Sequence, residues 1–430
     1  MKIHVKGFGK IKSADIDLGS LTIFVGENNS GKTYLMQLIY QVLDFLKDLE
    51  GLHKFLNEDI THIDQNNWMQ INNAVNNWLQ TNKNTFVKKV FLSKVPIKEI
   101  SVDFDKIEGE YSLEDLSDLK ESTGAYDAFS ISYNNKLIYR HIIPETNSNV
   151  LNRTESFIAD VIEHVIFANR KSATSAIFFP ASRSGLMLVY REVMASQSRT
   201  QSIIDFAIKK EKNFLGLTRP VYDFLEFLQT YRFDSRDTQQ KKIVDFISNN
   251  LVDGTFDISS NAILYKSQYS DKFFPAHLSS SMVNELAPLV MMLTNLNDYN
   301  YVFYDEIETC LHPLKQIEMA RLVVRLVNSN YKMVISTYSD TMAIALNNLI
   351  LLSHLKDRDI KAEKLGYNKE DFFKNDDIHV YQFKSDKGKT TVSQIEMYPN
   401  INIGFDFDLF NKSSDKLYTD AKAIMEGTDE

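Results

Sequence analysis

Cysteine is almost absent from the sequence: Cys310 is the only one among 430 residues, so the chain cannot form an internal disulfide. This scarcity fits a reducing compartment, and we expect Cys310 to be a small buried residue. The sequence also lacks an apolar run near the roughly 18 residues that a membrane-spanning helix needs. Its N-terminus carries polar residues at short intervals and has no signal-peptide core. We therefore expect a cytoplasmic protein that does not contact a membrane.

A surplus of basic residues is absent too, because 57 acidic residues outnumber 48 basic ones and give a formal net charge of -9. This balance excludes an attraction of the whole surface to nucleic acid, although a local basic patch could still bind it. The most basic stretch, residues 190–250, could face DNA or a partner protein, and the alternative is a solvated helical surface. Its basic residues are Arg191, Arg199, Lys209, Lys210, Lys212, Arg219, Arg232, Arg236, Lys241 and Lys242.

What is present is the composition of an ordinary globular protein, with 43% hydrophobic and 24% charged residues. A chain of 430 residues favours one large domain with insertions, or two subdomains. We predict an α/β fold with a parallel-sheet core, a β-rich lobe and helical insertions. The predicted parts are an N-terminal lobe (1–150), a mainly helical insertion (151–275), a segment with further motifs (276–360) and a C-terminal segment (361–430).

Hydrophobic periodicity places the elements that matter for function. An apolar run at residues 21–25 predicts a strand, and helical spacing of apolar residues predicts a helix over 34–56. Alternating runs within 97–143, among them 100–104, suggest β-hairpins with a turn at Asn134 and Asn135. Two further apolar strands, at 301–304 and 332–336, are separated by a helix, which is the βαβ pattern of a parallel sheet.

The segment between the first apolar strand and its helix reads G-E-N-N-S-G-K-T and matches the phosphate-binding loop G-x-x-x-x-G-K-[ST] in every fixed position. Glycines let the backbone N–H groups wrap around phosphate oxygens at a helix N-terminus. Lys32 would reach the β and γ phosphates of ATP and assist catalysis, and Thr33 would bind Mg²⁺. The residues predicted to contact the nucleotide are Gly26, Asn28, Asn29, Ser30, Gly31, Lys32 and Thr33.

Two carboxylates follow the strand at 301–304, at the edge of a parallel sheet where ligands bind. Asp305 would hold Mg²⁺ directly or through water, and Glu306 would orient and deprotonate the attacking water as the catalytic base. A strand end with two solvated acids is the alternative. The phosphate loop in the same chain favours the catalytic interpretation. His312 nearby is interpreted as a structural residue at the turn before Pro313 rather than a metal ligand.

Residues 305–313, D-E-I-E-T-C-L-H-P, resemble the Walker B segment of ABC-class ATPases of the overcoming-lysogenization-defect (OLD) type, which are related to chromosome-structure and DNA-repair ATPases. Three other segments resemble the same family: G-F-G-K-I at 7–11, F-P-A-S-R-S-G at 179–185 and L-S-S-S-M at 278–282. The resemblance implies an ABC-type P-loop ATPase head that uses ATP and Mg²⁺. In this family two heads enclose two nucleotides, so it also implies a homodimer or a higher homo-oligomer.

Ser279, Ser280 and Ser281 stand where the family has its signature serines, ahead of a helix predicted over 282–296. Hydroxyls and free N–H groups at a helix N-terminus suit a phosphate. By the resemblance, one serine would contact the γ-phosphate that the opposite head holds. The glycine that usually follows is missing, and Ser280 is the favoured contact. A helix N-cap without a ligand is the alternative.

Residues 336–340, S-T-Y-S-D, resemble the family's S-T-H-S switch, but Tyr338 replaces the histidine. Tyrosine is longer than histidine and neutral near pH 7, so it cannot copy every contact of an imidazole. Hydrolysis at this site could therefore be slow or of normal speed. Slow hydrolysis suits a second hypothesis, a nucleotide-dependent scaffold or DNA-transaction ATPase that stores a partner protein and releases it.

The resemblance also raises the question of an effector, since many relatives carry a Toprim nuclease after the ATPase core. Roughly ninety residues follow Ser336, which is short for that domain. Asp406 and Asp408 form a D-x-D pair, but we interpret them as a solvated acidic loop. The resemblance then implies a stand-alone ATPase of bacterial anti-phage defence that controls a separate nuclease or toxin. DNA or a phage protein could be a further partner.

Overall fold

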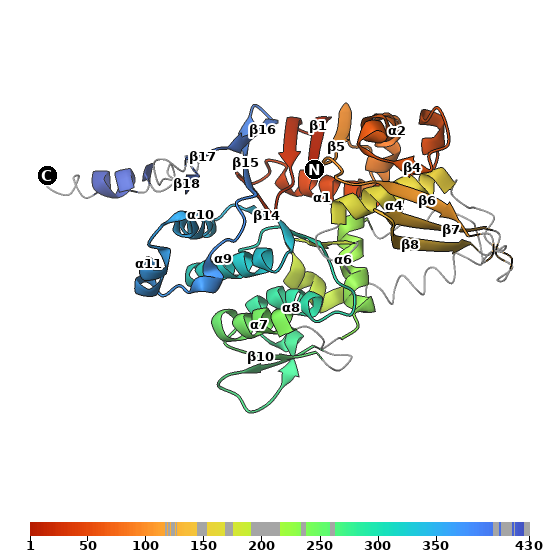
Figure 1. The fold of residues 1–430 in the computed structure, drawn as a ribbon. Coiled ribbons are helices and arrows are strands. Elements are labelled where there is room, and N and C mark those ends of the chain that lie inside the picture. Colours follow the sequence, from red (N-terminus) through yellow and green to blue (C-terminus); the bar gives the residue numbers. More distant parts are fainter. Residues whose placement is uncertain are drawn as a thin grey trace, which may run out of the picture.

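The computed structural model shows an α/β core with three smaller sheets and a set of covering helices (Figure 1). It describes residues 1–116, 118, 121, 125, 127–143, 153–167, 175–190, 216–233, 238–258, 263–398, 404–405, 415–416 and 418–424. Several residues singled out in the sequence lie outside this described part. They are Asp406, Asp408, Arg191, Arg199, Lys209, Lys210, Lys212 and Arg236.

A nine-stranded sheet forms the centre of the molecule, in the order β5-β1-β2-β16-β15-β3-β14-β13-β9. The strands β15, β3, β14, β13 and β9 run parallel, whereas β1 is antiparallel to β2 and β5. This arrangement confirms the predicted α/β class. In chain order the strands are β1 (Lys2–Phe8), β2 (Ile11–Asp17), β3 (Leu21–Gly26), β5 (Glu99–Asp103), β9 (Ala176–Phe179), β13 (Tyr301–Tyr304), β14 (Lys332–Thr337), β15 (Ile378–Asp386) and β16 (Lys389–Ile395).

The helices are α1 (Lys32–Phe45), α2 (Gln65–Phe91), α4 (Arg153–Phe167), α6 (Arg219–Thr230), α7 (Thr238–Phe246), α8 (Ser281–Leu293), α9 (Pro313–Asn328), α10 (Asp340–His354) and α11 (Arg358–Leu365). Shorter helical turns are η1 (Leu52–Phe55), η2 (Ile247–Leu251), η3 (Ala276–Leu278) and η4 (Lys369–Asp371). The helix predicted over 34–56 ends at Phe45, although Leu49 and Leu52 beyond it are buried. The spacing of apolar residues indicates which side chains are buried, and here the buried side chains continue beyond the end of the helix. None of the described helices is both long and apolar enough to cross a membrane.

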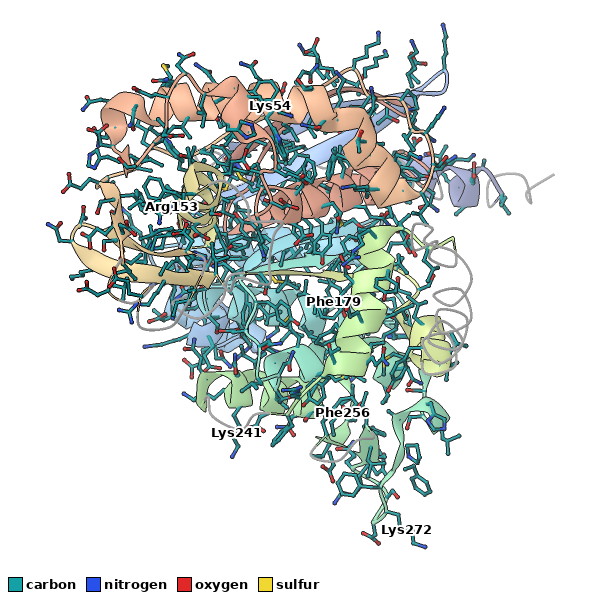
Figure 2. All side chains as sticks on the ribbon, turned by 90° about the vertical axis from the view of Figure 1, so that its right-hand side faces the viewer. Lys54, Arg153, Phe179, Lys241, Phe256 and Lys272 are labelled. Atoms are coloured by element: carbon teal, nitrogen blue, oxygen red, sulfur yellow. The ribbon has the colours of Figure 1, made fainter. Side chains whose placement is uncertain are left out.

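Helices cover both faces of the parallel half of the sheet, so neighbouring side chains of one strand enter different cores. Phe24 of β3 packs in the core that contains α1, α2 and α4, whereas Ile23 and Val25 pack in the core that contains α8, α9 and α10. All residues of β3 and β13 are buried for this reason. Figure 2 shows Phe179, from the neighbouring strand β9, inside the molecule.

The β-rich lobe is a four-stranded antiparallel sheet of β4 (His62–Ile63), β6 (Tyr111–Asp115), β7 (Asp127–Tyr133) and β8 (Lys136–Ile143). The predicted turn joins β7 to β8, and Asn134 and Asn135 have left-handed φ angles of 48° and 61°. The strand predicted at 100–104 is β5, which pairs with β1 in the central sheet instead of joining the lobe, and α2 packs against it there. The remaining strands are β10 (Gly254–Asp257), β11 (Leu264–Ser267), β12 (Phe274–Pro275), β17 (Met397–Tyr398) and β18 (Gly404–Phe405).

The C-terminal segment contributes two strands to the central sheet that the sequence analysis did not predict. β15 lies between β3 and β16, and its residue Phe383 stands beside Gly26. The φ angle of Gly26 is 149°, and a Cβ there would lie 2.5 Å from the Phe383 carbonyl oxygen. Only glycine fits at this position. β15 therefore lies directly beside β3, the strand that leads into the phosphate loop.

Candidate functional site

The phosphate loop joins β3 to α1 and folds around the ammonium group of Lys32. Lys32 Nζ donates to Gly26 O at 2.8 Å and to Glu27 O at 2.9 Å. No described side chain caps the N-terminus of α1, which follows Gly31 with a φ of 98°. The buried Ser30 Oγ has no hydrogen-bond partner among the described residues. The loop therefore offers an ammonium, a hydroxyl and free helix N–H groups, which are the donors that phosphate oxygens need.

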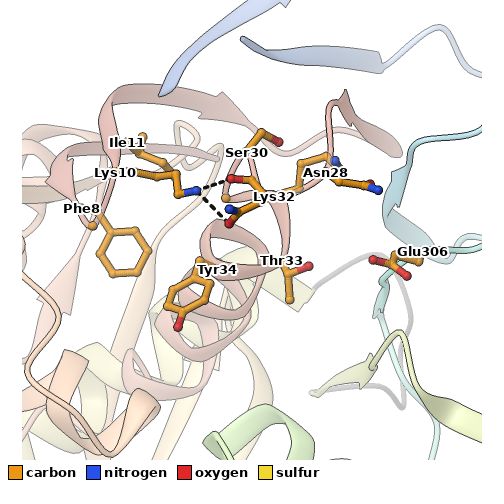
Figure 3. A pocket seen from close by; sticks show the side chains of 12 residues that line it. Phe8, Lys10, Ile11, Asn28, Ser30, Lys32, Thr33, Tyr34 and Glu306 are labelled. Carbon is orange, nitrogen blue, oxygen red and sulfur yellow. Dashed lines mark hydrogen bonds between the residues drawn. The ribbon is translucent and has the colours of Figure 1, made fainter. Parts of the chain in front are cut away.

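A cavity of about 460 Å³ lies along this loop (Figure 3). Lys10, from the turn between β1 and β2, donates to the side-chain oxygen of Asn29 at 2.8 Å and closes one wall. The structure thus brings all of the predicted loop residues except Gly26 to the lining of one cavity. The lining residues are Phe8, Gly9, Lys10, Ile11, Asn28, Asn29, Ser30, Gly31, Lys32, Thr33, Tyr34 and Glu306.

The predicted Mg²⁺ ligands Thr33 and Asp305 meet at the edge of the sheet. Thr33 Oγ1 donates to Asp305 Oδ2 at 2.8 Å, and Ser336 Oγ, at the end of β14, donates to Asp305 Oδ1 at 2.5 Å. Burial raises the pKa of the Asp305 carboxyl, although both hydrogen bonds oppose the rise. A hydroxyl and a carboxylate suit Mg²⁺, which uses few protein ligands when phosphate supplies others. No group of three or more His, Cys, Asp or Glu within the described residues could hold a metal ion by itself.

Glu306 faces the same cavity from the side opposite the loop (Figure 3). Its backbone is left-handed, with a φ of 48°, and its N–H donates to Ser336 Oγ at 2.8 Å. Partial burial, followed by the charges of Asp305 and Glu308, raises the pKa of Glu306. A carboxylate with a raised pKa accepts a proton more readily near neutral pH. The strained backbone persists because the end of β14 holds it, and it directs the side chain at the cavity.

Tyr338 lies just beyond β14, and its position depends on Glu308, which the sequence analysis gave no role. The Tyr338 N–H donates to Glu308 Oε1 at 2.9 Å, and the other oxygen of this buried carboxylate has no hydrogen-bond partner among the described residues. The Tyr338 side chain is 41% exposed. Burial, followed by the charges of Glu306 and Glu308, raises the pKa of the phenol. The phenol therefore stays neutral near pH 7, beside the acids but outside the lining of the cavity.

The family model of the AAA ATPase domain matches residues 1–343, which is most of the chain. The chain belongs to this AAA ATPase domain family. Membership confirms the predicted ATP-binding ATPase domain with its P-loop. The OLD-type relationship and the role in defence stay predictions. No curated protein matches the chain.

Solved structures similar to this AAA ATPase domain protein are distant. One is an SMC head bound to the C-winged helix domain of ScpA, with 12% identity and a TM-score of 0.37, covering 94% of this chain and 99% of that one. Another is a Pyrococcus furiosus Smc head with an extended coiled coil, bound to the C-terminal domain of ScpA, with 11% identity, a TM-score of 0.39 and coverage of 94% and 97%. An SMC head from Thermotoga maritima has 11% identity, a TM-score of 0.35 and coverage of 92% and 98%.

The three signature-like serines of the ATPase domain stand where the sequence predicts them, at the start of α8. Ser280 is the N-cap, and its Oγ accepts from Val283 N at 3.4 Å. All three serines are at least partly exposed. Among the described residues, none of the three lines the cavity at the phosphate loop. The structure therefore does not bring Ser279, Ser280 or Ser281 to the nucleotide site of their own chain.

Arg183, like Glu308, is a residue of the site to which the sequence analysis gave no role. It is fully buried, and its NH1 donates to Asp305 O at 2.6 Å while NH2 donates to Glu306 O at 3.1 Å. Its Nε forms an ion pair with Glu285 Oε2 of α8 at 2.7 Å, and its guanidinium stacks over the Tyr304 ring. Arg183 therefore links the backbone of Asp305 and Glu306 to α8, the helix that begins at the three serines. The only sequence signal was an arginine inside the F-P-A-S-R-S-G segment.

The expectations for Cys310 and His312, in the loop that follows the site acids, have different outcomes. Cys310 is exposed rather than buried, because it stands in a turn, with a φ of 61°, between the buried residues Glu308 and Leu311. The interpretation of His312 as structural is confirmed. Its Nδ1 accepts from Leu314 N at 3.3 Å and caps α9.

Proposed function

We propose that the chain is an ATPase that binds ATP with Mg²⁺ between the phosphate loop and the acids after β13. The observation that supports this most is the contact of Thr33 with Asp305, with Glu306 across the same cavity. Lys32 and the N–H groups of α1 would hold the phosphates, and Thr33 and Asp305 would hold Mg²⁺. Bound Mg²⁺ neutralises phosphate charge. Glu306 would orient the attacking water and accept its proton.

A second copy of the chain would complete the site in this proposal. The cavity has no contribution from Ser279, Ser280 or Ser281 among the described residues. Ser280 caps the N-terminus of α8, and all three serines are at least partly exposed. Helix N-termini attract anions. Two copies placed so that each serine set faces the other copy's phosphate loop would enclose two nucleotides, and ATP would then promote dimerisation or a larger homo-oligomer.

The finer role in this proposal is control of a separate nuclease or toxin in anti-phage defence. It is supported by the OLD-type resemblance of residues 305–313. DNA or a phage protein would act as the trigger. Purified chain that cleaved DNA by itself would contradict a separate effector.

The direct test of ATP binding is the replacement of Lys32 by alanine. Loss of the ammonium that the loop surrounds should lower ATP affinity by about tenfold or more, because a charged contact to phosphate is worth at least 1.4 kcal/mol. Isothermal titration of ATP with Mg²⁺ into wild type and variant measures the change. Lys54→Ala, at an exposed lysine on η1, is the matched control and should bind as wild type does. Equal affinity in wild type and Lys32→Ala would contradict the proposal.

On the side of the cavity away from Glu306, Phe8, Ile11 and Tyr34 offer an apolar surface that fits the nucleotide base (Figure 3). Tyr34 is 53% exposed and stacks on Phe91 at 5.2 Å between ring centroids. Because base stacking on an aromatic ring contributes about 1–3 kcal/mol, Tyr34→Ala should weaken ATP binding by about five- to 150-fold. Tyr34→Phe keeps the ring and should bind ATP as wild type does. Titration of both variants decides this, and similar affinities for Tyr34→Ala and Tyr34→Phe would show that the base lies elsewhere.

A further inference from the structure

A second cavity, of about 400 Å³, lies between α7, the C-terminal end of α9, η4 and the loop after η4. It shares no lining residue with the cavity at the phosphate loop. α9 begins at Pro313, just after the acidic loop, and ends at Asn328, which lines the second cavity. The two cavities therefore lie near opposite ends of one helix. The volume is in the range of small-molecule sites.

The charge of this cavity is opposite to that of the whole chain. Four cationic side chains line it against the single lining carboxylate of Glu370. Asp371 pairs with Arg325 and Asp359 pairs with Lys369, so one positive charge remains in excess, in a chain with a net charge of -9. The four are Arg325, Lys242, Lys369 and Lys374. Neither Lys242 nor Lys374 has a carboxylate partner within salt-bridge distance in the described part of the chain. Figure 2 shows Lys241, the neighbour of Lys242 on α7, at the surface.

Arg325 gives the cavity a rigid cation. Its side chain is 9% exposed, its NH2 donates to the buried Asp371 Oδ1 at 2.8 Å, and its guanidinium stacks over Phe246 at 4.1 Å. The outer partner of its NH1 is Glu370, whose side chain is 58% exposed. A fixed guanidinium binds phosphate with little loss of entropy. An incoming anion could replace the exposed carboxylate without disturbing the inner contacts.

The walls are polar and held in place. Gln239 Nε2 donates to Ser329 Oγ at 2.9 Å, and Asn328 Nδ2 donates to Phe372 O at 2.7 Å. On the outer side, Asp359 lies 3.7 Å from Lys369 and limits the basic region. A confined basic cavity bounded by acids fits a compact anion better than the long backbone of a nucleic acid, which needs an extended basic stripe.

We propose that this cavity binds a small molecule with two or more linked phosphate groups, at a site separate from the ATP site. Arg325 would bind one phosphate in place of Glu370, and Lys242, Lys369 and Lys374 would contact the others. With Glu370 displaced, Lys242 and Lys374 supply two positive charges beside Arg325, which suits linked phosphate groups. Through α9 the ligand would act at the far end of the helix that follows the site acids.

The test is isothermal titration of inorganic tripolyphosphate into the full chain carrying Lys32→Ala, which disables the phosphate loop. We expect saturable binding that Lys242→Glu with Lys374→Glu weakens by about tenfold or more, and that raised salt weakens further. Glu370→Gln should tighten binding, because it removes the competing carboxylate. Lys361→Glu with Lys364→Glu on the neighbouring helix α11 is the matched control and should leave binding unchanged. Thermal melting of each variant confirms that it is folded.

Three results would overturn the proposal. One is no saturable binding to the Lys32→Ala chain. Another is equal weakening by the control pair on α11, which would indicate only a general effect of charge. The third is tighter binding of a short single-stranded DNA than of tripolyphosphate, lost with Lys242→Glu and Lys374→Glu, which would assign the cavity to nucleic acid instead.

Discussion

Replacing Glu306 by glutamine is expected to lower the rate of ATP hydrolysis by about 100- to 10,000-fold while ATP still binds. The amide keeps the shape of the side chain that faces the cavity but cannot accept a proton. It also removes a negative charge beside Asp305 and Glu308, so ATP binding should be equal or tighter. Phosphate release measures turnover, and titration measures affinity. Size-exclusion chromatography with light scattering should show an ATP-dependent dimer or larger oligomer in the variant.

The matched control is Glu58→Gln, an exposed carboxylate outside the phosphate loop that does not line the cavity. It should hydrolyse ATP at the wild-type rate. Unchanged hydrolysis in Glu306→Gln would remove Glu306 from the catalytic role. A wild-type chain that binds ATP and oligomerises without measurable turnover would instead support the scaffold hypothesis, because Tyr338, which is neutral and partly exposed, replaces the histidine of the S-T-H-S switch that residues 336–340 resemble.

The parts of the site that are predictable from the sequence are those in which adjacent residues share one task. The loop from Gly26 to Thr33 is continuous, and a strand and a helix frame it. Asp305 and Glu306 directly follow an apolar strand. Each pattern is local, so its meaning does not depend on knowing which distant segment packs beside it.

The parts that sequence analysis missed depend on contacts between distant segments. Phe383 stands beside Gly26, but its strand could be placed only by knowing that the chain returns to the centre of the sheet. The local sequence signal for a hairpin was the pair Lys387 and Gly388. In the structure these two residues form the turn between β15 and β16, with φ angles of 47° and 77°. Arg183 is read as an ordinary arginine unless Glu285, far along the chain, is known to be buried next to it.

Replacing Arg183 by methionine is expected to destabilise the fold by about 3–5 kcal/mol, because it leaves the carboxylate of Glu285 buried without its cation. The carbonyl oxygens of Asp305 and Glu306 lose their donor in the same step. Urea unfolding of wild type and variant side by side measures the loss. Because these carbonyls set the position of both site acids, the turnover number of folded Arg183→Met should fall more than its ATP affinity.

A double variant separates the buried charge from the positioning of the site. Arg183→Met with Glu285→Gln removes both charges, so much of the lost stability should return. Removing both members of a buried ion pair costs far less stability than leaving one member buried without its partner. Hydrolysis should stay low, because no donor to Asp305 O and Glu306 O is restored. Recovery of full hydrolysis together with stability would show that Arg183 acts on the fold alone. If Arg183→Met were as stable as wild type, the ion pair with Glu285 would not hold α8 to the site acids.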